Sequence, residues 1–294
     1  MGTSCQTRVG FVGVGAMGAP MARNLLRAGH TVIAFDLSAD RLKAVASDGA
    51  EAASDAPDVV GRADVVLTSL RSSEAFADVA WESFVPNARE GQLFIDLGTT
   101  AAPDTRAIAA ALAERGAALV DAPVSGGPGG AASGTLHIFV GGAPAAVERA
   151  MPILEILGGR VTHCGPSGAG QVVKGVNQLA MGLTIAAYLE AIAFAVRAGV
   201  APETVGRAVG GEEEWRRQVE GIAQAIAAGN GSGLTVKFPE LRYFLKEADE
   251  KGFPLPLTHA LLEFCDRGEH RFLDNMNRPE PSFWHELSTR PKGS

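Results

Sequence analysis

VGFVGVGAMGAPMARNLLRAGHTVIAFD, residues Val9 to Asp36, decides the fold of the first half of this chain. The apolar runs Val9 to Val12 and Thr31 to Phe35 have the length and composition of buried strands. The stretch Ala19 to Ala28 between them is compatible with a helix. A strand, a glycine-rich turn, a helix and a second strand in this order predict a βαβ unit.

The turn of this unit carries three glycines in the pattern Gly-x-Gly-x-x-Gly. Gly13 permits a tight turn, Gly15 lets the backbone approach a pyrophosphate, and Gly18 lets the helix pack against the strand. The N–H groups and positive dipole end of the helix then face the phosphates. Asp36 follows Gly13 by 23 positions (36 − 13), near the ~20 at which an acid takes a ribose hydroxyl. We therefore predict a dinucleotide site rather than a unit whose glycines serve only as turn residues.

Asp36 also bears on the choice of cofactor. A carboxylate accepts hydrogen bonds from a ribose diol but repels a 2′-phosphate, which normally requires a cation at this point. Leu37 and Ser38 follow Asp36, and the next arginine is Arg41. The sequence therefore favours NAD over NADP.

Composition excludes several classes of function. The chain has 294 residues, enough for two domains, and 46% of them are hydrophobic. A net charge of −7 without a long Lys/Arg block argues against nucleic acid as a partner. Cys5, Cys164 and Cys265 are scattered and fit neither a disulfide framework nor a metal site. No apolar segment precedes the first strand, so we expect no secretory signal and a cytoplasmic location.

Apolar runs alternate with helix-compatible stretches as far as Cys164. This alternation predicts a mostly parallel, doubly wound sheet. Ligands bind such sheets beyond the carboxyl ends of the strands. The stretches expected at that edge are Leu70-Arg71, Gly98-Thr99-Thr100 and Pro123 to Gly127.

The pattern becomes helical from Gly168 onward, and Val172 to Ala198 predicts one long helix that is apolar round most of its surface. Polar residues interrupt this helix too often for a membrane span, namely Lys174, Asn177, Gln178, Glu190 and Arg197. One small helical domain can hardly cover such a helix on all sides. We therefore expect self-association into a homodimer or homotetramer.

Two polar stretches remain as candidates for the chemistry. Ser125-Gly126-Gly127 offers a hydroxyl and consecutive backbone N–H groups, which suit a small anion such as a carboxylate, or it is an ordinary connection between strands. Lys174 and Asn177 are three residues apart on an otherwise apolar helix. Burial would bring the Lys174 pKa toward the range of a general acid or base. Alternatively, Lys174 reaches solvent or pairs with an acid.

Together these stretches resemble the 3-hydroxyacid (β-hydroxyacid) dehydrogenase family, which includes 3-hydroxyisobutyrate dehydrogenase, tartronate semialdehyde reductase and, more distantly, 6-phosphogluconate dehydrogenase. The resemblance lies between Val9 and Gln178, in GFVGVGAMGAPMARNLLRAGH, DLGTT, DAPVSGGPGGAASGTLHIFVGG and GAGQVVKGVNQ. It implies an α/β Rossmann-type NAD-binding domain with a doubly wound parallel sheet over residues 1–165. An all-helical substrate and dimerisation domain on a long central helix would follow over residues 166–294.

The resemblance also implies a reaction and a set of site residues. A hydride would pass between NAD and a small 3-hydroxy acid, or the matching semialdehyde would be reduced, without a metal ion. The pyrophosphate would lie on Gly13, Val14, Gly15, Ala16, Met17 and Gly18, the nicotinamide near Leu70 and Thr99, and the substrate carboxylate on Ser125, Gly126 and Gly127. Lys174 would be the catalytic acid/base, and Asn177 would hold the substrate hydroxyl or carboxylate.

Three stretches depart from the family pattern and leave the substrate open. Arg71 stands where most members have proline, and it either offers a cation to an acidic substrate or is solvated. The usual Lys-Asp-Leu motif corresponds to Pro239-Glu240-Leu241, which lacks the lysine, although Lys237 lies two residues earlier. Trp215-Arg216-Arg217 either lines a pocket or forms a solvated helix face, the interpretation that we favour.

Two other classes of protein share the architecture that the resemblance implies. Imine reductases reduce C=N bonds, and non-catalytic scaffolds only bind nucleotides. Both generally lack the lysine that this chain has at Lys174. The lysine therefore favours a dehydrogenase.

Overall fold

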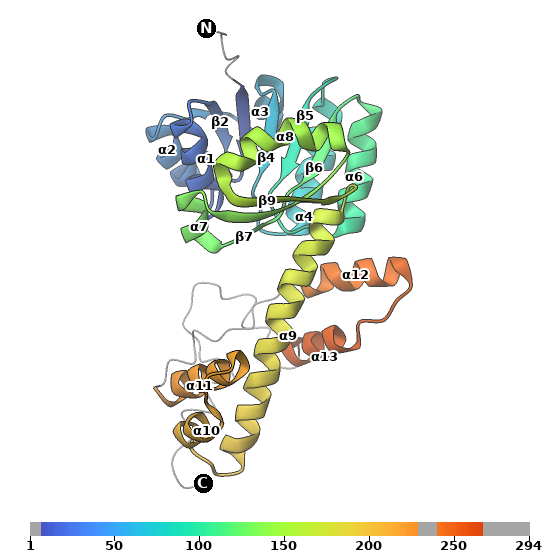
Figure 1. Cartoon of the computed structure of the whole chain (residues 1–294). Coiled ribbons are helices and arrows are strands. Elements are labelled where there is room, and N and C mark those ends of the chain that lie inside the picture. The colour runs from blue at the N-terminus through green and yellow to red at the C-terminus, as the bar shows by residue number, and fades with distance from the viewer. Residues whose placement is uncertain (1–6, 229–239, 267–294) are drawn as a thin grey trace. The chain divides into compact units, whose positions relative to one another are not determined.

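The computed structural model of the protein describes residues 7–228 and 240–266. Within these residues, the first part of the chain folds around one sheet of nine strands (Figure 1). The strands are β1 (Arg8–Val12), β2 (Thr31–Phe35), β3 (Glu51–Ala52), β4 (Val65–Thr68), β5 (Leu93–Asp96), β6 (Ala118–Asp121), β7 (Val124–Ser125), β8 (Leu136–Gly141) and β9 (Gly158–Gly165). Their order is β3-β2-β1-β4-β5-β6-β8-β7, with β9 paired to β8. From β3 to β6 all neighbours are parallel, whereas β8 runs antiparallel to β6 and β7. The predicted mostly parallel, doubly wound sheet is confirmed.

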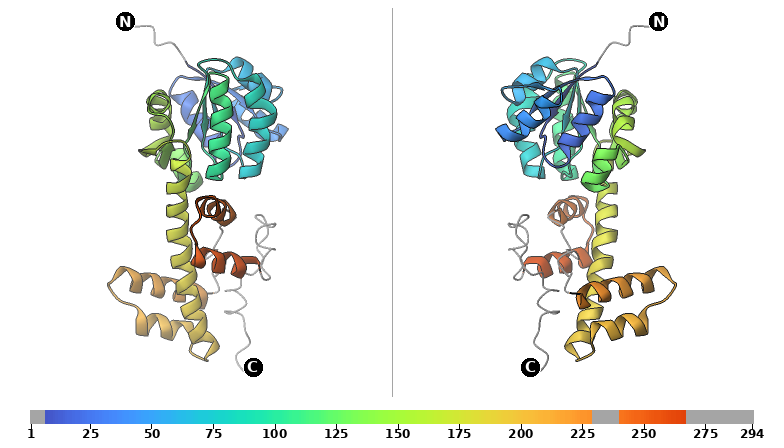
Figure 2. Two further views of the ribbon diagram at one scale, coloured as in Figure 1. Left: turned by 90° about the vertical axis from the view of Figure 1, so that its right-hand side faces the viewer. Right: turned by 90° about the vertical axis from the view of Figure 1, so that its left-hand side faces the viewer.

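Helices cover both faces of this sheet, as the two side views in Figure 2 show. They are α1 (Gly18–Arg27), α2 (Ala39–Ser47), α3 (Ala56–Arg62), α4 (Ser73–Val79), the π-helical turn η1 (Ala80–Phe84), α5 (Val85–Asn87), α6 (Ala102–Glu114), α7 (Gly127–Ser133) and α8 (Pro144–Leu157). Alternate residues of one strand face opposite cores, so Phe11 packs with α1, α7 and α8, and Val12 packs with α3, α4 and α6. Two-sided burial explains why the strands are continuous apolar runs.

Neither α3 nor α7 was predicted from the sequence. The α3 segment begins after Asp55, whose carboxylate accepts the Asp58 N–H at 2.7 Å as an N-cap. It packs so closely on β1 that a Cβ built on Gly10 would lie 2.4 Å from Val59 Cγ1. The second is α7, which forms within the glycine-rich stretch after β7. The amide of Asn24 donates to the Ala131 carbonyl at 2.9 Å and ties α7 to α1.

The later residues form helices α9 (Ala169–Arg197), α10 (Pro202–Val209), α11 (Glu214–Ala227), α12 (Leu241–Lys251) and α13 (Pro256–Asp266). One cluster joins the second half of α9 to α10 and α11 around Leu189, Ile192 and Ile222. A smaller cluster contains Leu241 and Leu261, with residues of α9 packed against them. The helical second part that the sequence predicts is confirmed for residues 169–228 and 240–266.

The chain divides into two compact units within α9. The first is Met1–Val176 with Lys246–Gly252, and the second is Asn177–Leu245 with Phe253–Ser294. The sequence pattern places its boundary earlier, after residue 165, where β9 ends.

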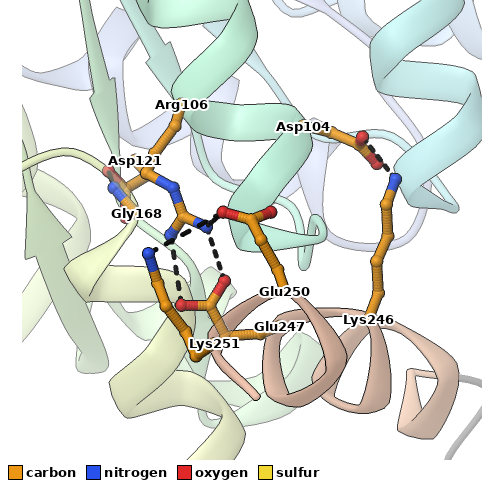
Figure 3. Close-up of polar contacts among 8 residues, drawn as sticks. All are labelled: Asp104, Arg106, Asp121, Gly168, Lys246, Glu247, Glu250 and Lys251. Carbon is orange, nitrogen blue, oxygen red and sulfur yellow. Dashed lines mark hydrogen bonds and ion pairs between the residues drawn. The ribbon is translucent and has the colours of Figure 1, made fainter.

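Ion pairs attach the last residues of α12 to α6 in the first unit (Figure 3). The Arg106 guanidinium lies 2.7 Å from both Glu247 and Glu250, and Lys246 Nζ lies 2.6 Å from Asp104 Oδ1. The carboxylates of Glu247 and Glu250 come from successive turns of one helix and meet a single planar cation. These pairs explain why a short piece of α12 belongs to the sheet unit.

Much of the long helix is apolar and exposed. Val176 is 62% exposed and Phe194 is 77% exposed. By length and composition alone, Ala169–Val196 is apolar enough to cross a membrane, and 22% of its most apolar window is buried within the chain. A core helix of a soluble protein has the same length and composition.

Candidate active site

Residues 13–18 form the glycine loop after β1, and its three glycines differ in how much room the fold leaves for a Cβ atom. Gly13 has φ +90°, and a Cβ there would lie 2.5 Å from the Ser69 carbonyl oxygen. A Cβ on Gly18 would lie 2.0 Å from the Gly13 carbonyl oxygen, so the start of α1 rests directly on the loop. At Gly15, by contrast, the nearest atom of the protein is Arg41 Nη1 at 3.7 Å. Close packing therefore accounts for Gly13 and Gly18 but not for Gly15.

The start of α1 is left without a side-chain cap. Its N-cap residue is Met17, which accepts no hydrogen bond from the first turn, whereas Ser38 caps α2 and Asp55 caps α3. Within the first turn, the Ala19 N–H donates to the Gly15 carbonyl oxygen at 3.0 Å and Pro20 has no N–H, so a ligand would meet the Gly18 N–H and the backbone of the loop before it. An uncapped helix start beside an open glycine fits the pyrophosphate of a dinucleotide.

Asp36 lies directly after β2 with its carboxylate held in place. Its Oδ2 accepts the Val14 N–H at 2.9 Å, and its Oδ1 accepts the Ser38 N–H at 2.8 Å. Each carboxylate oxygen keeps a second acceptor position, which suits a ribose diol. Arg41 is exposed and lies near the loop, so a cation stands closer to this site than the order of residues alone indicates.

Leu70 and Thr99 follow β4 and β5. A Cβ on Gly13 would lie 2.8 Å from Leu70 Cδ2, so the Leu70 side chain closes over the glycine loop. Thr99 is half-buried between Gly98 and Thr100, in the turn that leaves β5. Both residues therefore stand at the edge of the sheet where the parallel strands end.

Lys174 lies on the second turn of α9 and is buried, with 6% of the residue exposed. Its Nζ donates to the Val124 carbonyl oxygen at 2.9 Å. The next residue is half-buried Ser125, followed by Gly126 and Gly127 with positive φ angles of 132° and 62°. A buried amine and a loop with a hydroxyl and accessible backbone thus meet at the end of β7.

Asn177 lies three residues beyond Lys174 on α9. It therefore shares the side of the helix that carries Lys174.

Two buried carboxylates in this region were not recognised from the sequence. Asp96 and Asp121 end β5 and β6, are partners in the sheet register, and have no exposed surface. Burial raises the pKa of Asp96 to about 6, against hydrogen bonds from Thr100, Gly98 and Thr68. Burial also raises the pKa of Asp121. The signal in the sequence was a charged residue that ends an apolar strand, once in DLGTT and once in DAPVSGG.

The positions that depart from the family pattern have different surroundings. Arg71 is exposed. Trp215 is 45% exposed, and the Arg216 guanidinium stacks 4.3 Å from the centre of its ring. Arg217 pairs with Glu214 one turn away. Lys237 and Pro239 lie outside the described residues, as does the tail from residue 267.

Comparison with known proteins adds independent findings. Residues 8–165 match the family described as the NAD binding domain of 6-phosphogluconate dehydrogenase. Residues 168–276 match the family described as NAD-binding of NADP-dependent 3-hydroxyisobutyrate dehydrogenase. The two matches meet where the strands end and α9 begins.

Individual relatives cover most of the chain. The 2-(hydroxymethyl)glutarate dehydrogenase of Eubacterium barkeri is 34% identical over 89% of each chain. The NAD-dependent L-serine dehydrogenase of Pseudomonas aeruginosa is 39% identical over 72% of each. A solved 3-hydroxyisobutyrate dehydrogenase of Mycobacterium tuberculosis with L-serine has a TM-score of 0.74 at 29% identity, over 89% of this chain and 94% of the other. An imine reductase from Pseudomonas sp., at 23% identity and a TM-score of 0.60, shares the fold alone.

Proposed function

Because the chain belongs to the 3-hydroxyacid dehydrogenase family, we propose that it transfers a hydride between NAD and a small 3-hydroxy acid with Lys174 as general acid and base. The observation that supports this assignment is the hydrogen bond from Lys174 Nζ to the Val124 carbonyl oxygen. This bond holds a buried amine beside residues 125–127, which we call the Ser125 loop. An amine in this position can exchange a proton with a substrate whose carboxylate lies on the loop.

The cofactor is NAD, and its nicotinamide, when bound, takes up the hydride that leaves the carbinol carbon. Residues of this chain provide its binding site. Residues 13–18 and the start of α1 bind the pyrophosphate, and Asp36 accepts hydrogen bonds from the adenosine ribose. Leu70 and Thr99 contact the nicotinamide side.

The substrate carboxylate binds to the Ser125 hydroxyl and to the backbone of Gly126 and Gly127. Asn177 holds the substrate hydroxyl or the carboxylate. In oxidation, Lys174 Nζ accepts the hydroxyl proton, which permits the hydride to leave. In reduction, the same amine, now protonated, donates that proton to the carbonyl oxygen.

The Ser125 hydroxyl and the backbone N–H groups of Gly126 and Gly127 favour a substrate with a carboxylate. They leave the substituent of the acid open. The named relatives act on 3-hydroxyisobutyrate, L-serine and 2-(hydroxymethyl)glutarate, so these three acids form the first panel.

The decisive experiment measures NAD reduction at the NADH absorbance band with this panel, for the wild type and for Lys174→Ala. We expect turnover in the wild type and a loss of about 10²- to 10⁴-fold in the variant. NADH binding, followed by fluorescence, should be unchanged in Lys174→Ala. The control is Lys251→Ala, which removes a half-exposed lysine paired with Glu250. Near-normal turnover in Lys174→Ala would exclude the acid–base role, and cofactor binding without turnover on any acid would favour a scaffold.

We also propose that residues 1–165 form the NAD-binding domain and residues 166–294 the substrate and dimerisation domain. The exposed apolar side chains of α9 support assembly into a homodimer or homotetramer, since their burial against a second copy removes them from water. Such an assembly would be soluble and cytoplasmic. Light scattering at micromolar concentration tests it, and a monomer would contradict it.

A further inference from the structure

The first turn of α9 rests on the two buried carboxylates, neither of which takes part in the proposed proton transfer. Asp121 Oδ1 accepts the Gly168 N–H at 2.8 Å, a bond between two residues drawn in Figure 3, and Oδ2 accepts the Gln171 N–H at 3.1 Å. A negative charge at this end of a helix is favoured by the helix dipole. Asp121 therefore acts as an N-cap that is supplied by a strand instead of by the helix itself.

Glycines make this close approach possible. A Cβ on Gly170 would lie 2.3 Å from the Phe139 carbonyl oxygen and 2.8 Å from Asp121 Oδ2. A Cβ on Gly141 would lie 2.5 Å from the same carboxylate oxygen. Side chains at these positions would separate the helix from the sheet, so the position of the first turn of α9 on β6 and β8 is tightly defined.

The side chain of Gln171 adds a second attachment, to β5. Its Oε1 accepts the Thr100 N–H at 3.0 Å, and its Nε2 donates to the Gly98 carbonyl oxygen at 3.0 Å and to Asp96 Oδ2 at 3.4 Å. Gln171 is 1% exposed. The amide has one permitted orientation, because the Thr100 N–H can only donate and the Gly98 carbonyl can only accept.

Lys174 follows Gln171 by three residues, so the two side chains leave the same side of α9. Any rotation or shift of the first turn therefore moves the Lys174 amine away from the Val124 carbonyl. We propose that Gln171 is a positioning residue for Lys174, which holds α9 on the ends of β5 and β6 so that the amine reaches the Ser125 loop. This role rests on the proposed function of Lys174.

The first test replaces Gln171 with alanine. A displacement of about 1 Å at a catalytic group can lower the rate ~100-fold, so we expect kcat to fall about 10- to 100-fold. The dissociation constant of NADH should change less than about threefold, because the glycine loop and Asp36 are untouched. The pH midpoint of kcat/KM should shift by about half a unit or more, since the surroundings of Lys174 change.

A matched control separates positioning from general stability. Gln92 is also a buried glutamine, 4% exposed, and its Nε2 donates to two backbone carbonyls, of Val60 at 2.8 Å and Ala63 at 3.0 Å. It lies before β5, at the opposite end of that strand from Asp96. Gln92→Ala should lower the melting temperature as Gln171→Ala does, but keep the kcat and the pH midpoint of the wild type.

A measurement without cofactor or substrate tests the position of the amine directly. Acetic anhydride labels exposed lysine amines, and peptide mass spectrometry gives the rate at Lys174. We expect Gln171→Ala to label about tenfold faster at this site, because the amine leaves its buried position. In Gln92→Ala the rate should equal that of the wild type.

Gln171→Glu covers the case in which the alanine variant does not fold. It keeps the length and the acceptor for Thr100, but it sets an oxygen against Asp96 Oδ2 and the Gly98 carbonyl. One shared proton relieves this repulsion. The kcat of Gln171→Glu relative to the wild type should therefore be highest near pH 6 and fall about tenfold by pH 8.

The positioning role would be overturned if Gln171→Ala kept the kcat, the pH midpoint and the labelling rate of the wild type. It would also be overturned if Gln92→Ala changed these three quantities as much as Gln171→Ala does. A flat ratio in Gln171→Glu would do the same. An active Lys174→Ala would instead reject the proposed function, and the labelling rates would still decide whether Gln171 holds the amine in place.

Discussion

The starts of α1 and α9 lie at the same edge of the sheet, where parallel strands end, but their first turns are capped differently. The first turn of α1 has no side-chain cap and borders the open space at Gly15. The first turn of α9 is bonded to the buried carboxylate of Asp121. One helix start is thus left for the anion of a ligand, and the other already has an anion of the protein.

The two helix starts therefore suit different tasks, since one can bind a ligand and the other can hold a catalytic group in place. An exposed N-terminus can receive a phosphate reversibly, because solvent replaces the ligand when it leaves. A buried N-terminus cannot exchange its carboxylate for water without loss of stability. The helix that carries the candidate acid–base group is therefore expected to be rigid at its start.

The largest effect is expected where the protein's own anion is removed. Asp121→Ala leaves the N–H groups of Gly168 and Gln171 buried without an acceptor. Each such donor costs ~1–3 kcal/mol, so urea unfolding should show a loss of about 3–5 kcal/mol. The control is Asp55→Ala at the exposed cap of α3, which should cost about 1 kcal/mol. An Asp121→Ala protein no less stable than Asp55→Ala would show that α9 is held mainly by other contacts.

The second effect concerns pH, through Asp96. Its pKa of about 6 in the fold lies above the ordinary value of 3.8, so the native state holds this proton more tightly than the unfolded chain does. The carboxyl therefore contributes most stability at pH values below 3.8, and that contribution is lost as pH rises through 6. Because a pKa shift of one unit is worth 1.36 kcal/mol, the shift from 3.8 to about 6 sets an upper value of ~3 kcal/mol for the change in stability.

Other carboxyl groups also titrate in this pH range, so the experiment compares the unfolding free energy of the wild type with that of Asp96→Asn. Asn at position 96 carries no titrating proton. Unfolding free energies of the wild type and Asp96→Asn, measured from pH 5 to pH 8, should show the variant gaining stability relative to the wild type as pH rises. A constant difference would mean that Asp96 has an ordinary pKa in the fold.

The third effect tests whether the open start of α1 binds a ligand. At Gly15 the protein leaves room for a Cβ, so Gly15→Ala should fold with the melting temperature of the wild type. A methyl group there faces the pyrophosphate, and we expect the NADH dissociation constant to rise about 10- to 100-fold. Gly61→Ala on α3 is the matched control, since its Cβ also meets open space. If both variants bind NADH equally well, the pyrophosphate does not lie on this loop.

The two helix starts also differ in how far the sequence predicts them. The β1–α1–β2 unit was predicted because its strands, turn and acid lie within one short stretch. The role of each of its residues follows from residues close to it in the sequence. The supports of α9 link residues far apart, with 47 positions between Asp121 and Gly168 and 75 between Asp96 and Gln171. No spacing rule connects such pairs. The sequence shows Gln171 only as part of a glycine-rich motif before Lys174, and its hydrogen-bond partners come together only in the folded sheet.

The helix α7 shows a second limit of sequence interpretation. Residues 127–133 contain three glycines and a proline, which predict a loop by composition. Tertiary contacts overrule this preference, because Ala131 is fully buried and its carbonyl oxygen accepts a hydrogen bond from the Asn24 amide of α1 at 2.9 Å. The prediction of Ser125 and the following glycines as a binding loop did not depend on this helix.

The smallest effect concerns which dinucleotide the open helix start prefers. Asp36 disfavours a 2′-phosphate, but Arg41 lies 3.7 Å from the Cβ position of Gly15 and supplies a cation near the same loop. Asp36→Ser keeps a hydrogen-bonding group and removes the repulsion, so the ratio of kcat/KM for NAD to that for NADP should fall about tenfold. Asp40→Ser, which changes an exposed acid on α2, is the control and should leave the ratio unchanged. If Asp36→Ser leaves the ratio unchanged, the carboxylate serves only the Val14 and Ser38 N–H groups. If Asp36→Ser with Arg41→Ala loses the gain for NADP, Arg41 is the group that accepts the phosphate.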